Sequence, residues 1–189
     1  IDVKKNNGTK SGDVLVLTKP LGVGLTLNAL RMDDCSKEMQ ERVFKSMTTL
    51  NKYACDILKK YDVHALTDVT GFGLLVHLNE MLDEKNSAVI YKDSIPYFDD
   101  CQKYVEEFYL SGAAQTNRNS VEGKIYFDCD FFTEEILFDP QTSGGLLASV
   151  SKEDLEKLEI DFKENNLELY VVGEVIEKNE YNVYVRGMK

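Results

Sequence analysis

The stretch from His64 to Gly73 combines a single carboxylate with a glycine-containing turn in an order that suits cation and phosphate chemistry. The pattern predicts a short strand ending at Asp68, followed by a Gly71-x-Gly73 turn that opens an amphipathic helix. This order puts the Asp68 carboxylate at the carboxyl end of a strand, beside the backbone N–H groups of a helix N-terminus. A carboxylate oxygen binds hard cations such as Mg²⁺, while free amides and the helix dipole favour a phosphate oxygen nearby.

A second turn of this kind, DPQTSGG at residues 139–145, precedes the apolar run 146–150. Each feature also has a purely structural interpretation. Asp68 could cap the following turn through its side chain, and Gly71 and Gly73 could serve only to make that turn tight. A Gly-x-Gly pair without a third glycine or a Lys-Ser/Thr tail is a weak phosphate signal.

Four further residues have chemistry that the pattern alone leaves open. Lys19 follows the first predicted strand, where it could contact a phosphate or remain a solvated strand-end lysine. Arg118 has the same two interpretations, within a stretch predicted to be a mobile loop. His64 is expected to be a hydrogen-bonded strand residue, and His77 is expected to lie on a helix surface.

The composition excludes some classes of partner. The 189 residues include 22 basic and 33 acidic side chains, which gives a net charge of −11. A surface of that sign repels nucleic acid and anionic membranes, whose binding requires clustered Lys and Arg. It does not exclude a nucleotide, because exposed charges are screened beyond about 8 Å at physiological salt.

The lengths of the apolar runs and the positions of the cysteines indicate membrane attachment and cellular compartment, respectively. No apolar run approaches the ~20 residues that a transmembrane helix needs. The four cysteines are scattered without metal-finger spacing, so we expect buried thiols in a reducing, cytoplasmic protein.

The periodicity of apolar residues predicts alternating strands and helices, with strands crowded toward the end. Expected strands are 14–17, one ending at 68, 88–91, 124–127, 146–150, 170–176 and 181–185, the last two forming a closing pair. Ser36 is predicted to cap one long helix whose stripe is Val43, Met47, Leu50, Ala54 and Ile57.

Other segments are expected to be a loop at 20–24, helices from 74 and within 96–108, a polar loop at 111–122, and a capping box at 151–154. These elements predict an α+β (α/β layered) fold, a mixed β-sheet packed with helices.

Five segments taken together resemble one enzyme family. They are GDVLVLTKPLG at 12–22, MTTLNK at 47–52, TDVTGFG at 67–73, TNRN at 116–119 and DPQTSGG at 139–145. In this order they resemble the C-terminal domain of selenophosphate synthetases (selenide, water dikinases), within the aminoimidazole ribonucleotide synthetase-like superfamily. TKPLG and DPQTSGG are the motifs specific to this enzyme, whereas the superfamily shares mainly the Asp–Gly-x-Gly helix start.

The resemblance implies an activity and a domain arrangement. The family makes selenophosphate from selenide, ATP and water, releases AMP and phosphate, and requires Mg²⁺. Its members are cytoplasmic homodimers with two α/β domains, and the reactive Cys or selenocysteine and its Lys lie in the N-terminal domain. We therefore expect residues 1–11 to be a residual interdomain segment and 12–189 to be the C-terminal domain, with the N-terminal catalytic domain absent from this chain.

The resemblance also implies site residues. The metal carboxylate of the TDVTGFG motif corresponds to Asp68, whereas the nucleophile has no counterpart here, so we expect no catalytic residue in this chain. Lys19, Thr67, Gly71 and Gly73 are the candidate cofactor-binding residues, with Asn51 and the 142–145 turn as further candidates without assigned roles. We expect the isolated chain to be inactive and to bind metal weakly at most.

Two alternatives stay open from the sequence. The chain could belong to another ATP-dependent enzyme of the superfamily, such as a thiamine-phosphate kinase or a hydrogenase-maturation relative. It could also be a binding or assembly module that uses the fold without catalysis. In the selenophosphate synthetase interpretation the partners are ATP, selenide and its own N-terminal domain, with no nucleic acid or membrane.

Overall fold

The computed structural model describes residues 5–188, and the structural statements below refer to these residues. The strands are β1 (Val14–Leu17), β2 (Val63–Asp68), β3 (Asn86–Tyr91), β4 (Ile125–Phe127), β5 (Leu146–Val150), β6 (Tyr170–Glu177) and β7 (Val183–Arg186). The helices are α1 (Val23–Arg31), α2 (Lys37–Thr48), α3 (Lys52–Leu58), α4 (Gly73–Met81), α5 (Cys101–Glu106), α6 (Gly112–Ser120), α7 (Phe131–Phe138) and α8 (Leu155–Glu164). Single 3-10 turns cover Lys92–Ser94 and Lys152–Asp154.

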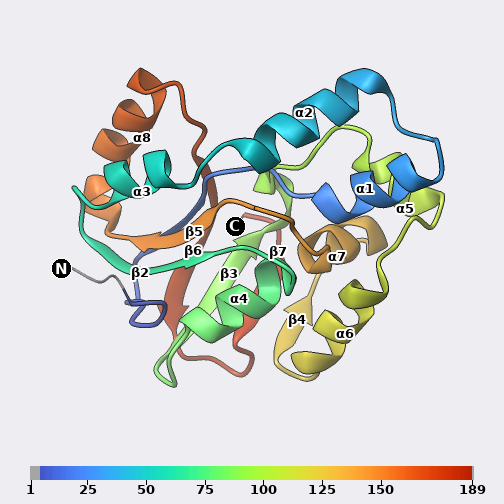
Figure 1. Cartoon of the computed structure of the whole chain (residues 1–189). Helices are drawn as coiled ribbons and strands as arrows, with labels where there is room; N and C mark the ends of the chain where they lie inside the picture. The colour runs from blue at the N-terminus through green and yellow to red at the C-terminus, as the bar shows by residue number, and fades with distance from the viewer. Residues whose placement is uncertain (1–4, 189) are drawn as a thin grey trace.

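One mixed sheet organises the fold. Its strand order is β2-β5-β1-β6-β3-β7-β4, with antiparallel pairs from β2 to β3 and parallel pairs from β3 to β4. Helices cover both faces, with α3 and α8 on one side and α1, α4, α5 and α7 on the other (Figure 1). The expected layered α+β fold with a mixed sheet is confirmed.

Strand β1 lies at the centre of the sheet and is buried on both faces. Leu15 and Leu17 belong to the core under α1, α4, α5 and α7, whereas Val14 and Val16 belong to the core under α3 and α8. Successive side chains of a strand point to opposite faces, so an uninterrupted apolar run is required where both faces are covered. The prediction from the run 14–17 is confirmed.

The predicted long helix is two helices. Helix α2 ends at Thr48 and α3 begins at Lys52, and Leu50 between them is 60% exposed. The Thr49 carbonyl accepts a hydrogen bond from the Lys19 ammonium instead of continuing the helix. The 3.6-residue pattern of apolar residues therefore continues through a break at which the side chain of Lys19, from the segment after β1, binds the backbone. Ser36 does cap α2, as predicted, by accepting from the Met39 N–H at 3.1 Å.

The predicted loop at 111–122 is mostly helix α6. Ser111 caps it by accepting from the Ala113 N–H, and its buried face contains Ala114 and Asn117. Because the buried face consists of a small residue and a polar residue, the sequence of this segment has no apolar stripe that would predict a helix. Arg118 is accordingly not in a mobile loop: it pairs with Glu134 and Glu135 of α7.

Three smaller expectations are also corrected. Strands β6 and β7 do not pair, because β3 lies between them. Ser151 makes no side-chain cap, so the capping box is absent. Of the four thiols, which are all free, only Cys101 is buried.

The N-terminal segment packs against the sheet. The Lys5 carbonyl accepts from the Leu66 N–H at 3.0 Å, and the Asn86 amide donates to the Thr9 carbonyl at 2.6 Å. The predicted interdomain segment 1–11 thus has ordered contacts from residue 5, while residues 1–4 lie outside the described part. Within residues 5–188, no helix combines the length and apolar character needed to cross a membrane.

Candidate functional site

Three of the motif segments meet at one end of the sheet. Strands β1 and β2 both run antiparallel to β5, so the ends of β1 and β2 lie beside the start of β5, where Asp68 is paired with Leu146. The 139–145 turn leads directly into this start. A Cβ on Gly144 would lie 2.2 Å from the Val69 carbonyl oxygen, and one on Gly145 would lie 2.6 Å from the Lys19 nitrogen. These two glycines are required because the turn passes between the other two motifs.

Asp68 is the last residue of β2 and its side chain is exposed. Among residues 5–188, no hydrogen bond or ion pair ends on its carboxylate; the Thr67 hydroxyl donates to its backbone carbonyl at 3.4 Å. The interpretation of Asp68 as a side-chain cap for the next turn therefore has no supporting contact. An exposed carboxylate with both oxygens available is a suitable ligand for a hard cation.

The turn from 69 to 73 uses most of its own amides. The N–H of Val69 donates to the Gly145 carbonyl at 2.8 Å, and that of Gly73 donates to the Thr70 carbonyl at 3.0 Å. The Thr70 N–H donates to the His77 ring at 3.2 Å. Within this turn, only the N–H groups of Gly71 and Phe72 have no hydrogen-bond acceptor among residues 5–188. The phosphate contact expected for this turn is therefore limited to these two amides.

The two glycines of this turn differ in their roles. Gly73 has φ +74° and a Cβ there would lie 2.8 Å from the Phe138 carbonyl oxygen, so both conformation and packing require glycine. Gly71 is exposed with open space around it, and its carbonyl accepts from the buried Asn117 amide at 2.9 Å. A ligand can approach Gly71 but not the α-carbon of Gly73.

The two histidines are structural. His64 bonds to Asp13 through Nδ1 at 2.9 Å and to Asp62 through Nε2 at 3.0 Å, which confirms the expected hydrogen-bonded strand residue. His77 is buried, contrary to the expected helix-surface position. Its Nε2 accepts from the Thr70 N–H, so the ring proton is on Nδ1, which lies 3.6 Å from Glu80.

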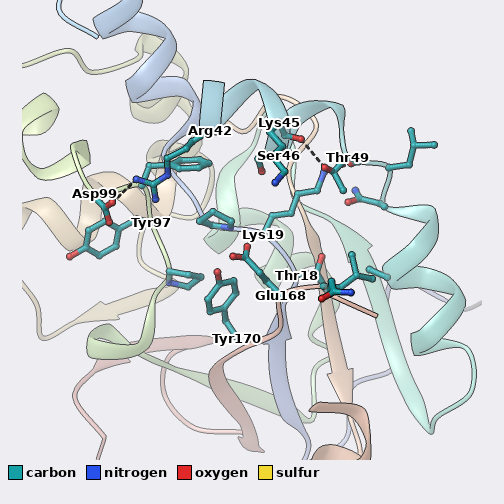
Figure 2. A pocket seen from close by; sticks show the side chains of 18 residues that line it. Thr18, Lys19, Arg42, Lys45, Ser46, Thr49, Tyr97, Asp99, Glu168 and Tyr170 are labelled. Carbon is teal, nitrogen blue, oxygen red and sulfur yellow. Dashed lines mark hydrogen bonds and ion pairs between the residues drawn. The ribbon is translucent and has the colours of Figure 1, made fainter. Parts of the chain in front are cut away.

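Lys19 is 7% exposed, which contradicts the interpretation of a solvated strand-end lysine. Its ammonium donates to the Thr49 carbonyl at 2.8 Å and to the Ser143 carbonyl at 2.9 Å. Figure 2 shows the side chain extending from the strand end toward Thr49. Burial lowers the pKa of this amine, and the two carbonyls compensate the charge.

A cavity of about 550 Å³ opens beside Lys19. Its walls include Arg42 and Lys45 of α2, Tyr97, Glu168 and Tyr170 (Figure 2). The Arg42 guanidinium is paired with Asp99 at 2.6 Å. These cavity residues carry no signal in the sequence, because they come from three segments that are distant along the chain and none of these segments has a local motif.

The first half of the 139–145 turn holds helix α1. Asp139 accepts from the Gly24 N–H at 2.9 Å, and Gln141 accepts from the Val23 N–H at 3.2 Å. Burial raises the pKa of Asp139 to about 7. Helix α1 begins after Gly22 (φ 105°), within the predicted 20–24 loop, and it was not expected because its capping groups lie more than 100 residues away.

A metal ion at this site would find a single carboxylate. Within the described part of the chain, no group of three or more His, Cys, Asp or Glu side chains is arranged to hold a metal. Mg²⁺ prefers six oxygen ligands and keeps several waters. The residues therefore fit a metal that takes one ligand from Asp68 and its other ligands from elsewhere.

Comparison with known proteins decides the family. The family model described as AIR synthase related protein, C-terminal domain, matches residues 10–186. The chain belongs to this family. A selenide, water dikinase from Agathobacter rectalis is 43% identical to this AIR synthase related domain over 185 residues, which are 97% of the chain and 54% of the relative. The resemblance to the C-terminal domain of selenophosphate synthetases is thereby confirmed.

Solved structures support the same fold at much lower identity. The hydrogenase maturation protein HypE of E. coli superposes with a TM-score of 0.67 at 17% identity, covering 98% of this domain and 50% of HypE. A thiamine-monophosphate kinase from Stenotrophomonas maltophilia gives 0.65 at 15% identity, covering 96% of this domain and 52% of the kinase. The AIR synthase related domain spans about half the length of the curated relatives it matches.

Proposed function

We propose that this domain is the C-terminal part of a selenide, water dikinase, an ATP-dependent enzyme that makes selenophosphate from selenide and water and releases AMP and phosphate. The relative with this name matches 97% of the chain at 43% identity. The structural observation that carries the proposal is the exposed Asp68, whose carboxylate has no hydrogen bond or ion pair among residues 5–188, at the point where three motif segments meet. In this proposal the domain comprises 12–189, and an N-terminal domain supplies the nucleophile.

Asp68 is proposed as one Mg²⁺ ligand. When bound, Mg²⁺ neutralises charge that develops on the phosphate oxygens during phosphoryl transfer. The chain contributes one hard oxygen donor at the end of β2. The Thr67 hydroxyl precedes it and the Gly71 amide follows it in the same motif. We propose that these two groups contact the nucleotide phosphates. Gly73 has no free amide for this purpose, since its N–H donates to Thr70.

The cellular setting follows from the same proposal. We propose a cytoplasmic homodimer whose partners are ATP, selenide and its own N-terminal domain. The net charge of −11 supports the absence of nucleic acid and anionic membranes among its partners. A single carboxylate is too few ligands for stable Mg²⁺ binding, so the isolated chain should form no selenophosphate.

The test uses the natural protein that contains this chain. Purified enzyme is incubated with ATP, selenide and Mg²⁺, and ³¹P NMR follows selenophosphate and AMP. Thiamine monophosphate replaces selenide in a parallel reaction, because a thiamine-monophosphate kinase shares the fold. Selenide-dependent AMP formation supports the proposal. Turnover of thiamine monophosphate alone, or no turnover of either substrate, contradicts it.

A further inference from the structure

We propose that Lys19 is a positioning residue: its ammonium clamps the 143–145 turn and thereby fixes Asp68, and it makes no contact with substrate. The inference deepens the proposed function, because the value of fixing Asp68 rests on its metal role. It replaces the cofactor-binding role that the sequence predicts for Lys19.

The Lys19 ammonium has two backbone carbonyl acceptors. The Thr49 carbonyl closes the C-terminus of α2, where the helix dipole favours a cation. The Ser143 carbonyl belongs to the turn, 124 residues along the chain. A buried ammonium must be hydrogen-bonded to offset its lost hydration, so Lys19 holds both carbonyls in place.

The 143–145 turn is held through its backbone carbonyls. Three successive carbonyls, those of Ser143, Gly144 and Gly145, accept from Lys19 (2.9 Å), the Asn51 amide (2.8 Å) and the Val69 N–H (2.8 Å). Ser143 has φ +52°, a left-handed conformation that a residue with a Cβ adopts only when its surroundings hold it. The Lys19 hydrogen bond ends on this strained residue.

The backbone of Val69 connects the 143–145 turn to the Asp68 carboxylate. Val69 directly follows Asp68, and its N–H donates to Gly145 while its carbonyl oxygen touches the α-carbon side of Gly144. Both polar groups of the Val69 backbone thus contact the turn that Lys19 clamps. Release of the turn frees the backbone on the C-terminal side of Asp68 and lets the carboxylate move.

The burial of Lys19 argues against direct substrate contact. Its side chain is 7% exposed and two of its three N–H donors are already used. Lys45, on the same cavity, is exposed and has no hydrogen bond or ion pair to its ammonium among residues 5–188. It provides a matched control, because the same substitution removes a lysine charge from the cavity without touching the turn.

The experiment compares Lys19→Met with Lys45→Met in this 189-residue chain. Amide hydrogen exchange by NMR reports the Val69 N–H, and Mn²⁺ broadening reports cation binding near residue 68. In Lys19→Met we expect Val69 to exchange roughly tenfold faster or more, relative to the amides of the buried Leu158 and Phe162 in α8, since a charge-assisted hydrogen bond is lost. Mn²⁺ broadening near residue 68 should need several-fold more Mn²⁺, while Lys45→Met resembles the wild type.

Two further variants separate positioning from general destabilisation. Val183→Ala in β7, four strands away from β5, lowers overall stability and should leave the Val69 exchange ratio unchanged. Asn51→Ala removes the neighbouring hydrogen bond to Gly144 and should loosen Val69 in the same direction, which provides the test if Lys19→Met does not fold.

The outcomes distinguish this inference from the proposed function. Unchanged Val69 exchange in Lys19→Met would mean that Lys19 does not hold the 143–145 turn, and the inference would be overturned. Faster Val69 exchange in Lys19→Met, together with unchanged selenide-dependent AMP formation by Asp68→Asn in the natural protein that contains this chain, would support the clamp but contradict the metal role of Asp68.

Discussion

Asp139 makes the stability of this domain depend on pH. This residue is 2% exposed, its Oδ2 accepts from the Gly24 N–H and the Gln141 side-chain amide, and its Oδ1 is buried without a hydrogen-bond partner among residues 5–188. Burial raises its pKa from 3.8 to about 7, because the charged form loses hydration. The folded state therefore retains a proton that the unfolded state releases.

The direction and size of the effect follow from linkage. A raised folded-state pKa means that this contribution is fully present below pH 3.8 and is lost as pH rises through about 7. A pKa difference of about 3 corresponds to about 4 kcal/mol over the whole interval, of which about 3 kcal/mol falls between pH 5 and pH 8. Asp139→Asn is neutral at every pH and nearly identical in shape, so it removes this dependence.

Urea unfolding at pH 5, 6, 7 and 8 measures the effect. The difference in unfolding free energy between Asp139→Asn and the wild type should shift by about 3 kcal/mol in favour of the variant as pH rises from 5 to 8. Asp83→Asn, an exposed carboxylate, serves as the control for the lost charge. If the two profiles for Asp139→Asn and wild type run parallel, the assignment of a neutral buried acid is wrong.

Two substitutions test the packing that assembles the site. Gly144→Ala puts a Cβ 2.2 Å from the Val69 carbonyl oxygen and should lower the free energy of unfolding in urea by about 2 kcal/mol or more. Gly112→Ala places its Cβ in open space and should lower the free energy of unfolding far less. Equal losses in the two variants would refute the close approach of Gly144 to Val69. Arg118→Ala leaves the largely buried Glu135 without its cation and uncovers the Phe138 ring, whose centroid lies 4.7 Å from the guanidinium carbon. We expect a loss of about 2 kcal/mol in urea unfolding, and a loss no larger than that of Arg31→Ala, at an exposed arginine, would contradict the ion-pair explanation.

The sheet could be predicted from sequence where apolar runs report burial directly. Strand β1 is a continuous apolar segment and β5 is interrupted only by Ser149, because both faces of this part of the sheet are covered. The pairing of β6 and β7 could not be predicted, since β3 enters between them from a distant part of the chain. A short-range turn signal carries no information about such an insertion.

The helices that sequence reasoning missed are set by long-range polar contacts. Helix α1 is capped by Asp139 and Gln141, and α6 is anchored by the buried Asn117. The break between α2 and α3 occurs where Lys19 takes the Thr49 carbonyl. In each case the hydrogen-bond partner that sets the helix boundary is distant in sequence, so the local pattern of apolar residues does not predict that boundary or predicts it wrongly.

The candidate site divides in the same way. The position of Asp68 at a strand end follows from a local pattern, and the structure bears it out. The burial of Lys19 depends on carbonyls at 49 and 143, which no local pattern reveals. The position of a carboxylate at a strand end was therefore predictable, whereas the long-range contacts around it were not.

The proposed metal role of Asp68 can be tested in the natural protein that contains this chain, through the proposed selenide-dependent AMP formation over a series of Mg²⁺ concentrations. Asp68→Asn keeps the shape of the side chain and removes its charge, and Asp83→Asn is the matched exposed control. We expect the Asp68 variant to lose roughly 100-fold in rate and to require more Mg²⁺, while the control retains both values. An Asp68→Asn enzyme with wild-type rate and wild-type Mg²⁺ dependence would contradict the assignment of this carboxylate as a metal ligand.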